Sequence, residues 1–301
     1  MPEPKDHTHP NTPHKNGLTN HDSIAQASTE GLEPQQGLNQ QQSLNQQQIL
    51  NQQQGLNQQQ GLNQQQGLNK HQGPQLKVCG MRDPDNMASV AALQPQFMGF
   101  IFWEKSKRFV SGTLPKLPRT IKKIGVVVNA LRADILGLME QHDLDGIQLH
   151  GQESPAFCEE LKKSLLNLSN TTKTSDAHTG QSATIIIKAF SVGDHFDFNQ
   201  LKAYEPYCDY FLFDTKGKLP GGNGHTFSWS LLKDYPSSKP YFLSGGIGLD
   251  SLDKLSNFLR DPAAKHCAVI DVNSTFERSD YTKDTEALAQ FKNTLQNLPS
   301  H

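Results

Sequence analysis

The chain has 301 residues, of which 28 are Lys or Arg and 30 are Asp or Glu, so its formal net charge is −2 at pH 7. This balance excludes the broad positive field that attracts nucleic acid or an anionic membrane surface. Its four cysteines are far apart and form no CxxC pair, which predicts free thiols and no metal site. We therefore expect the partner to be a small molecule.

The sequence carries no export or membrane signal. The first 14 residues are polar and lack the apolar core of a signal peptide. No apolar run approaches the roughly 20 residues that a membrane-spanning helix needs. These features predict a cytoplasmic protein that does not enter a membrane.

Residues 31–72 consist of a six-residue unit that recurs seven times, from GLEPQQ through several copies of GLNQQQ to GLNKHQ. Six residues turn an α-helix through about 600°, so successive leucines such as Leu38 and Leu44 fall on different faces. One leucine per unit buries too little apolar surface to offset the chain entropy lost on folding. We predict that residues 1–75 are disordered. Self-association through β pairing and a short hexapeptide β-helix remain alternatives.

Eight short apolar runs follow Pro74, and they predict a parallel sheet. Each run is rich in β-branched or aromatic residues and lacks polar alternation, as strands buried on both faces do. The runs are residues 76–79, 97–102, 124–129, 146–150, 184–188, 210–214, 241–244 and 267–272.

The segments between these runs include helical patterns at residues 85–93, 132–142, 156–166 and 249–259, so we expect strand, helix, strand order throughout. Eight such units in about 225 residues predict a single closed (β/α)8 TIM barrel over residues 76–300. An open doubly wound sheet is the alternative. The polar stretch 167–183 is predicted to be a surface insertion, on the barrel face opposite the loops that carry active sites.

Polar residues stand at or just after the C-terminal ends of several predicted strands, where no core requires them. Cys79 follows the first strand, and by base rates an isolated cysteine is more often a buried apolar residue than a catalyst. Asp214 ends the apolar run YFLFD, and burying this carboxylate without a role or a partner would be costly. A helix cap is the alternative role for Asp214.

Two glycine-containing or polar loops predict a phosphate site. GGIG at 245–248 and DVNS at 271–274 each follow a strand and precede a helix. Glycine lets backbone N–H groups approach an anion, and in barrel enzymes the seventh and eighth loops often bind phosphate. A third loop, PGGNGHTFSW at 220–229, contains Gly221, Gly222 and Gly224 and is typical of a lid, with an ordinary flexible turn as the alternative.

Seven motifs together resemble the phosphoribosylanthranilate isomerase family of tryptophan biosynthesis. They are KVCGM (77–81), SKRFV (106–110), QLHGQE (148–153), FDT (213–215), GGNGHTFSW (221–229), LSGGI (243–247) and IDVNS (270–274). The resemblance runs from Leu76 to about Leu298. It implies a single-domain barrel that acts without a cofactor or metal. The implied reaction is the Amadori rearrangement of N-(5-phosphoribosyl)anthranilate to the 1-deoxyribulose 5-phosphate product.

The resemblance also implies roles for individual residues. Cys79 stands at the family's general base and Asp214 at its general acid. Arg108 stands where an arginine holds the anthranilate carboxylate, and Asp271 and His150 would contact substrate. Phosphate would lie on Gly245, Gly246, Asn273 and Ser274. The enzyme would be a monomer or a homodimer.

Three positions depart from the family pattern. Thr275 stands where a glycine commonly follows the serine of the eighth loop, and we expect it to alter phosphate binding. Ser228 replaces an aspartate before Trp229, and Val127 replaces an aromatic residue. Two other functions stay open from sequence: another phosphate-binding barrel enzyme of biosynthesis, and a scaffold that assembles through the Gln-rich repeats.

Overall fold

The computed structural model describes residues 73–171, 184–215 and 228–298. The six-residue repeats, most of the predicted insertion and the predicted lid glycines Gly221, Gly222 and Gly224 lie outside these ranges. The first described strand begins at Gln75, one residue before the predicted start of the barrel.

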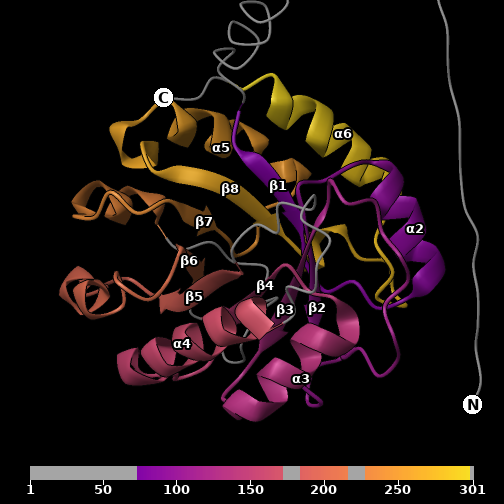
Figure 1. Ribbon diagram of the computed structural model, residues 1–301. Coiled ribbons are helices and arrows are strands. Elements are labelled where there is room, and N and C mark those ends of the chain that lie inside the picture. Colours follow the sequence, from indigo (N-terminus) through magenta and orange to yellow (C-terminus); the bar gives the residue numbers. More distant parts are fainter. Residues whose placement is uncertain (1–72, 172–183, 216–227, 299–301) are drawn as a thin grey trace, which may run out of the picture. The chain divides into compact units, whose positions relative to one another are not determined.

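Eight parallel strands form a closed barrel in the order in which they occur along the chain, with β1 paired to both β2 and β8 (Figure 1). This confirms the predicted (β/α)8 barrel, and the open-sheet alternative is wrong. The strands are β1 (Gln75–Val78), β2 (Phe97–Ile101), β3 (Lys122–Val127), β4 (Gly146–Leu149), β5 (Ile185–Val192), β6 (Tyr210–Thr215), β7 (Tyr241–Leu243) and β8 (Cys267–Val272).

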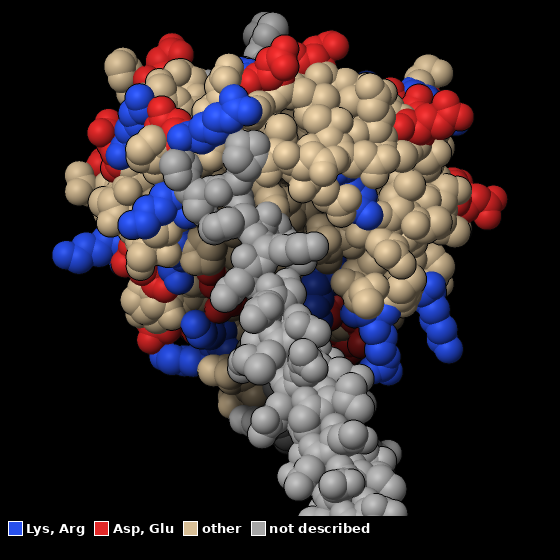
Figure 2. All heavy atoms as spheres, turned by 90° about the horizontal axis from the view of Figure 1, so that it is seen from above, with Lys and Arg blue, Asp and Glu red and all other residues tan. Residues whose placement is uncertain are grey.

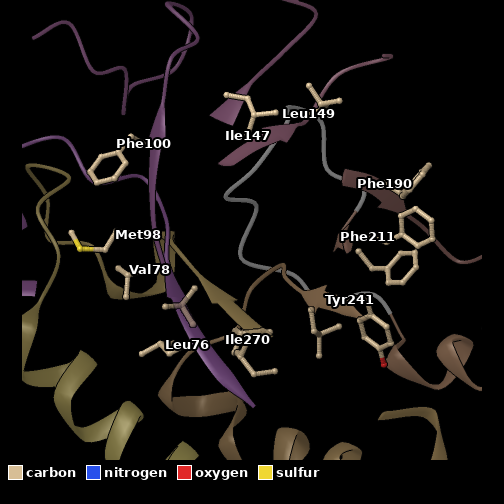
Figure 3. Packing of buried hydrophobic residues seen from close by; sticks show 14 of the residues in the cluster. Leu76, Val78, Met98, Phe100, Ile147, Leu149, Phe190, Phe211, Tyr241 and Ile270 are labelled. Atoms are coloured by element: carbon tan, nitrogen blue, oxygen red, sulfur yellow. The ribbon is translucent and has the colours of Figure 1, made fainter. Parts of the chain in front are cut away.

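Neighbouring residues of a strand point to opposite faces, and here both faces are buried. Phe97 and Leu212 belong to a cluster inside the barrel, whereas the next residues along the chain, Met98 and Phe213, belong to the larger cluster between strands and helices. Figure 3 shows part of that larger cluster, with Met98, Phe211 and Tyr241 among its labelled members. Two-sided burial explains why the strand sequences show continuous apolar runs instead of alternation.

Five α-helices are described: α2 (Pro84–Ala92), α3 (Arg132–His142), α4 (Pro155–Thr171), α5 (Leu252–Leu259) and α6 (Thr285–Gln296). Their ends follow local sequence signals. Asp83 caps α2 by accepting a hydrogen bond from Asn86 N at 2.8 Å, and Pro84 occupies the first turn, where its missing N–H costs nothing. Helix α4 continues through Thr171 and so includes the first residues of the predicted insertion.

The expected alternation of strand and α-helix is wrong in two places. Residues 102–121, between β2 and β3, contain no helix. Pro115 and Pro118 in this segment remove backbone donors and restrict the residues before them. Between β5 and β6 the chain forms only the 3-10 helix η1 (Phe198–Ala203). The described residues between β6 and β7, 228–240, contain the 3-10 helix η2 (Trp229–Asp234). Three further 3-10 turns are η3 (Leu249–Ser251), η4 (Pro262–Ala264) and η5 (Ser274–Phe276).

The described surface carries charges of both signs, and in the view of Figure 2 basic and acidic side chains are interspersed. None of the helices in the described ranges has the length and apolar character needed to cross a membrane.

Candidate active site

The barrel brings the predicted site residues together at the carboxyl ends of its strands, around one pocket. Parallel strands place these ends on the same rim, so residues far apart in sequence become neighbours. All nine described candidates line this pocket: Cys79, Arg108, His150, Asp214, Gly245, Gly246, Asp271, Asn273 and Ser274.

Cys79 follows β1 and is buried, with 5% of its surface exposed. Burial raises the pKa of the Cys79 thiol, and the negative charge of Asp271 acts in the same direction. The positive charges of Lys77 and Lys283 oppose this rise, and hydrogen bonding to Lys77 acts in the same direction as these charges. Two lysines therefore place positive charge near the thiol, although the net pKa of Cys79 stays above its usual value.

Lys77 is a fully buried lysine two residues before Cys79, so both side chains leave β1 on the same face. Its Nζ lies 2.9 Å from Asp271 Oδ2 on the adjacent strand β8. Burial acts to lower the pKa of Lys77, but the charges of Asp271 and Cys79 and hydrogen bonding to both together outweigh burial, and the pKa is raised. Burial raises the pKa of Asp271, against the pull of Lys77. Lys77 and Asp271 form a buried ion pair, in which the positive ammonium and the negative carboxylate lie 2.9 Å apart.

The second carboxylate oxygen of Asp271 remains available. Asp271 Oδ1 is buried and has no hydrogen-bond partner among the described residues. An unpaired buried acceptor is costly unless a ligand supplies a donor. Asp271 lines the pocket, so this oxygen can receive a hydrogen bond from a bound molecule.

Gly99 on β2 leaves the space that the Cys79 side chain occupies. A Cβ at position 99 would lie 2.7 Å from Cys79 Sγ and 3.1 Å from its Cα. We predict that Gly99→Ala displaces the thiol and lowers kcat by about 10²-fold, the effect of a misplacement of about 1 Å. Gly137→Ala is the control, because nothing lies within 4 Å of its added Cβ. Equal kcat values for the two variants would contradict this account.

Asp214 ends the buried part of β6 and is 5% exposed. Its Oδ1 accepts a hydrogen bond from Thr215 N at 2.9 Å, and its Oδ2 lies 3.4 Å from His150 Nε2. His150 Nδ1 lies 2.8 Å from Gln148 Nε2. Both ring nitrogens of His150 therefore face protein groups. His150 was predicted to contact substrate, and the structure also places it next to Asp214.

Arg108 reaches the pocket from the segment after β2, and Glu277 holds one edge of its guanidinium. Arg108 Nε and Nη2 each lie 2.6 Å from a Glu277 carboxylate oxygen. The hydrogen bond to Glu277 raises the pKa of Arg108. Although burial acts to raise the pKa of Glu277, hydrogen bonds from Arg108 and the charge of Lys283 hold it below its usual value. The Nη1 side of the guanidinium takes no part in this pair.

Lys283 connects this pair to the eighth loop. It is 1% exposed, and its Nζ lies 2.6 Å from Glu277 Oε1 and 2.7 Å from Asn273 Oδ1. Burial lowers the pKa of Lys283, and Glu277 opposes that effect. Lys283 thus fixes the Asn273 side chain, which the sequence predicted as a phosphate ligand.

The seventh and eighth loops form the glycine-rich end of the pocket. Gly245 and Gly246 have positive φ angles of 96° and 67°, and a Cβ on Gly245 would lie 2.3 Å from Thr215 Oγ1. Within the described residues, neither glycine N–H donates to a backbone carbonyl. Thr275 Oγ1 donates a hydrogen bond to the Ile247 carbonyl and so joins the two loops. These N–H groups are suited to bind an anion.

Sequence reasoning did not select four residues of this network: Lys77, Gln148, Glu277 and Lys283. Two of them had a readable signal. A lysine two positions before Cys79, and a glutamine two positions before His150, share a strand face with a candidate residue. Glu277 and Lys283 lie in a polar segment without periodicity, so no local pattern points to them.

No group of three or more His, Cys, Asp or Glu side chains is arranged to hold a metal ion within the described parts of the chain. In the pocket, Asp271 pairs with Lys77 and Asp214 lies next to His150, and Cys79 is the only cysteine among the lining residues. The arrangement combines a thiol next to a lysine, a carboxyl group next to a histidine, a guanidinium and two loops whose glycine N–H groups are suited to an anion.

A comparison with protein families and known proteins agrees with these features. The family model described as N-(5'-phosphoribosyl)anthranilate isomerase matches residues 76–185 and 173–294. The enzyme of that name from Phocaeicola vulgatus is 38% identical over 221 residues, covering 73% of this chain and 97% of the relative. The Parabacteroides distasonis enzyme is 39% identical over 222 residues, covering 72% and 90%.

Solved structures agree on the fold. The phosphoribosyl anthranilate isomerase structure from Thermotoga maritima has a TM-score of 0.58 at 24% identity, covering 75% of this chain and 100% of the other. A second isomerase structure, in complex with reduced 1-(o-carboxyphenylamino)-1-deoxyribulose 5-phosphate, has a TM-score of 0.57 at 23% identity, with the same coverage of 75% and 100%. The family match, together with relatives more than 30% identical over most of the barrel, shows that the chain belongs to the N-(5'-phosphoribosyl)anthranilate isomerase family.

Proposed function

We propose that Cys79 and Asp214 are the proton-transfer pair of an isomerase that converts N-(5'-phosphoribosyl)anthranilate to 1-(2-carboxyphenylamino)-1-deoxyribulose 5-phosphate. One observation carries this assignment. A single pocket contains the thiol, the Asp214 carboxyl, the Arg108 guanidinium and the glycine loops. The substrate has a group suited to each of them.

The Amadori rearrangement needs an acid and then a base. The acid delivers a proton to the ribose ring oxygen, which breaks the bond to C1 and leaves an iminium. The base then removes the proton from C2, which gives an enolamine. The enolamine becomes the ketone when its C2 hydroxyl loses a proton and C1 gains one. In our assignment Asp214 is the acid and Cys79 is the base. One proton leaves Asp214 and one reaches Cys79, so substrate and product are isomers.

Cys79 must act as a thiolate, and burial alone would oppose this. Lys77 lies beside the sulfur and lowers its pKa, as does the charge of Lys283. Because the net pKa of Cys79 is raised, we expect the thiolate fraction, and with it kcat/KM, to increase from neutral to alkaline pH.

The two anionic ends of the substrate have matching sites. The phosphate is assigned to the N–H groups of Gly245 and Gly246, with Asn273 and Ser274 beside them. The carboxylate is assigned to the side of the Arg108 guanidinium that Glu277 leaves open. The apolar pocket wall formed by Ile101, Trp103, Val126 and Val128 suits the aromatic ring.

We predict that Arg108→Ala chiefly weakens substrate binding. A charge-assisted hydrogen bond contributes about 1.5–3 kcal/mol, so KM should increase about 10- to 100-fold while kcat changes less. The assay follows the loss of substrate fluorescence. Arg132→Ala is the control, because Arg132 pairs with Glu160 on exposed parts of α3 and α4. An unchanged KM in Arg108→Ala would remove the proposed carboxylate site.

We also infer that the enzyme works in the cytoplasm as a monomer or homodimer, with residues 76–300 as its catalytic domain. All four cysteines, Cys79, Cys158, Cys208 and Cys267, are free thiols, which suits a reducing compartment.

A further inference from the structure

A row of polar side chains connects the strand that carries the base to the strand that carries the acid. Lys77 Nζ lies 2.7 Å from Gln148 Oε1. Gln148 Nε2 lies 2.8 Å from His150 Nδ1, and His150 Nε2 lies 3.4 Å from Asp214 Oδ2. Lys77 and Gln148 are 0% and 1% exposed. The row therefore crosses the barrel interior from β1 through β4 to β6.

The chemistry of each group fixes the direction of the hydrogen bonds. A lysine ammonium has three N–H donors and no acceptor, so the atom of Gln148 that faces Lys77 must be the amide oxygen. The amide NH2 of Gln148 then faces His150. An amide NH2 is only a donor, so Nδ1 of His150 must be the acceptor and carries no hydrogen. In the neutral imidazole the proton is consequently on Nε2, the nitrogen that faces Asp214.

The contacts of Lys77 make this orientation hard to reverse. Two of its three donors are used by Gln148 Oε1 at 2.7 Å and by Asp271 Oδ2 at 2.9 Å, so the ammonium is held from two sides. Turning the Gln148 amide would place its NH2 against the ammonium and its oxygen against His150, which leaves two buried donors facing each other. Gln148 is on β4, and His150 directly follows the strand and donates its backbone N–H to Val127 O at 2.9 Å, so the two side chains, two positions apart, point to the same face.

We propose that Gln148 is a positioning residue that holds His150 as the Nε2–H tautomer, so that this N–H stabilises the negative charge that Asp214 acquires when it gives up its proton. The proposal rests on the assignment of Asp214 as the acid. Asp214 Oδ1 already receives the Thr215 N–H at 2.9 Å, and His150 supplies the donor for Oδ2. The present 3.4 Å separation is longer than a strong hydrogen bond, and such contacts commonly shorten when substrate binds.

The tautomer is measured without substrate. In ¹⁵N-labelled enzyme at about pH 8, where an ordinary imidazole is neutral, ring nitrogens with and without a proton give well-separated ¹⁵N signals. The His150 pair is identified as the one missing from the spectrum of His150→Asn. We expect Nδ1 without a proton and Nε2 with one. A proton on Nδ1 of the unmodified enzyme would overturn the proposal.

Two substitutions of Gln148 test its part in opposite ways. In Gln148→Glu, the carboxylate accepts from both Lys77 and His150, so we expect a proton to appear on Nδ1. In Gln148→Leu, the ring loses its constraint and we expect signals from a mixture of tautomers. Unchanged His150 signals in both variants would refute the role of Gln148, whatever the activity of the enzyme.

The kinetic test separates positioning from binding. A lost donor at a developing charge typically lowers kcat strongly, so we expect Gln148→Leu to lower kcat about tenfold or more with KM changed less than about twofold. Gln152→Leu is the matched control, because Gln152 is exposed, follows the same strand and does not line the pocket. A Gln148→Leu variant with the kcat of the control would overturn the catalytic part of the proposal. Loss of activity in Gln148→Leu together with an unshifted His150 tautomer would overturn it as well.

Discussion

Asp214→Asn is expected to lower kcat by about 10²- to 10⁴-fold, the usual contribution of a general acid or base. Asparagine keeps the shape of the side chain and can still accept the Thr215 N–H, but it has no proton to give to the ribose ring oxygen. Substrate binding should be largely retained, because Asp214 is not one of the groups assigned to the two anionic ends. The measurement is single-turnover kinetics of substrate fluorescence with enzyme in excess.

The control for this variant is Asp134→Asn, which removes an exposed carboxylate from the first turn of α3. Cys79→Ser provides the companion test of the base, with Cys158→Ser as its control, because Cys158 is equally buried but lies on α4 outside the pocket. If Asp214→Asn or Cys79→Ser turned over substrate at the rate of its control, the assignment of that residue would be wrong.

Lys77→Met is expected to have the largest effect on stability. Removing one partner of a buried ion pair leaves the other charge uncompensated, which typically costs about 3–5 kcal/mol of the free energy of unfolding. Here the remaining charge is Asp271, whose other oxygen has no described partner. Urea denaturation measures the loss. The double variant Lys77→Met/Asp271→Asn should recover much of it, because no isolated charge remains.

The same substitution changes the reactivity of Cys79 in a direction that can be worked out. A nearby positive charge favours the thiolate, so losing Lys77 raises the pKa of Cys79 further and reduces the thiolate at any given pH. Alkylation of Cys79 by iodoacetamide should therefore slow, and its pH profile should move to higher pH. Asp271→Asn should move the profile to lower pH, because Asp271 raises the pKa of Cys79. Profiles that moved in the same direction in both variants would contradict this description.

The fold was largely predictable from sequence, because strands that are buried on both faces appear as continuous apolar runs. Eight runs of β-branched and aromatic residues correspond to the eight strands, although β5 extends to Val192, beyond its predicted end. The connections were less predictable. The segment 102–121 was expected to contain a helix, and its prolines, Pro115 and Pro118, were the signal against one. Between β5 and β6 the 3-10 helix η1 stands in place of the expected α-helix.

The site was predictable to the extent that it depends on strand ends. A residue that follows a parallel strand reaches the common rim, so Cys79, His150 and Asp214 could be grouped before the fold was known. Their supporting partners depend on contacts across the barrel. Arg108 and Glu277 are 169 residues apart in sequence, and Lys77 and Asp271 are 194 apart. Such pairs depend on the order of the strands in the barrel and on the path of the loops. The spacing of nearby residues in the sequence predicts neither the strand order nor the loop path.

The ion pair between Arg108 and Glu277 affects the thermodynamics of anion binding. A free arginine side chain has about 2 kcal/mol of rotamer entropy, which a ligand must normally suppress when it binds. In this protein Glu277 fixes the guanidinium before any anion arrives, and Lys283 fixes Glu277 and Asn273 together. The side-chain ordering therefore occurs during folding. An anion that binds here contacts a side chain that is already ordered, so its favourable binding enthalpy is not offset by the entropy cost of ordering Arg108.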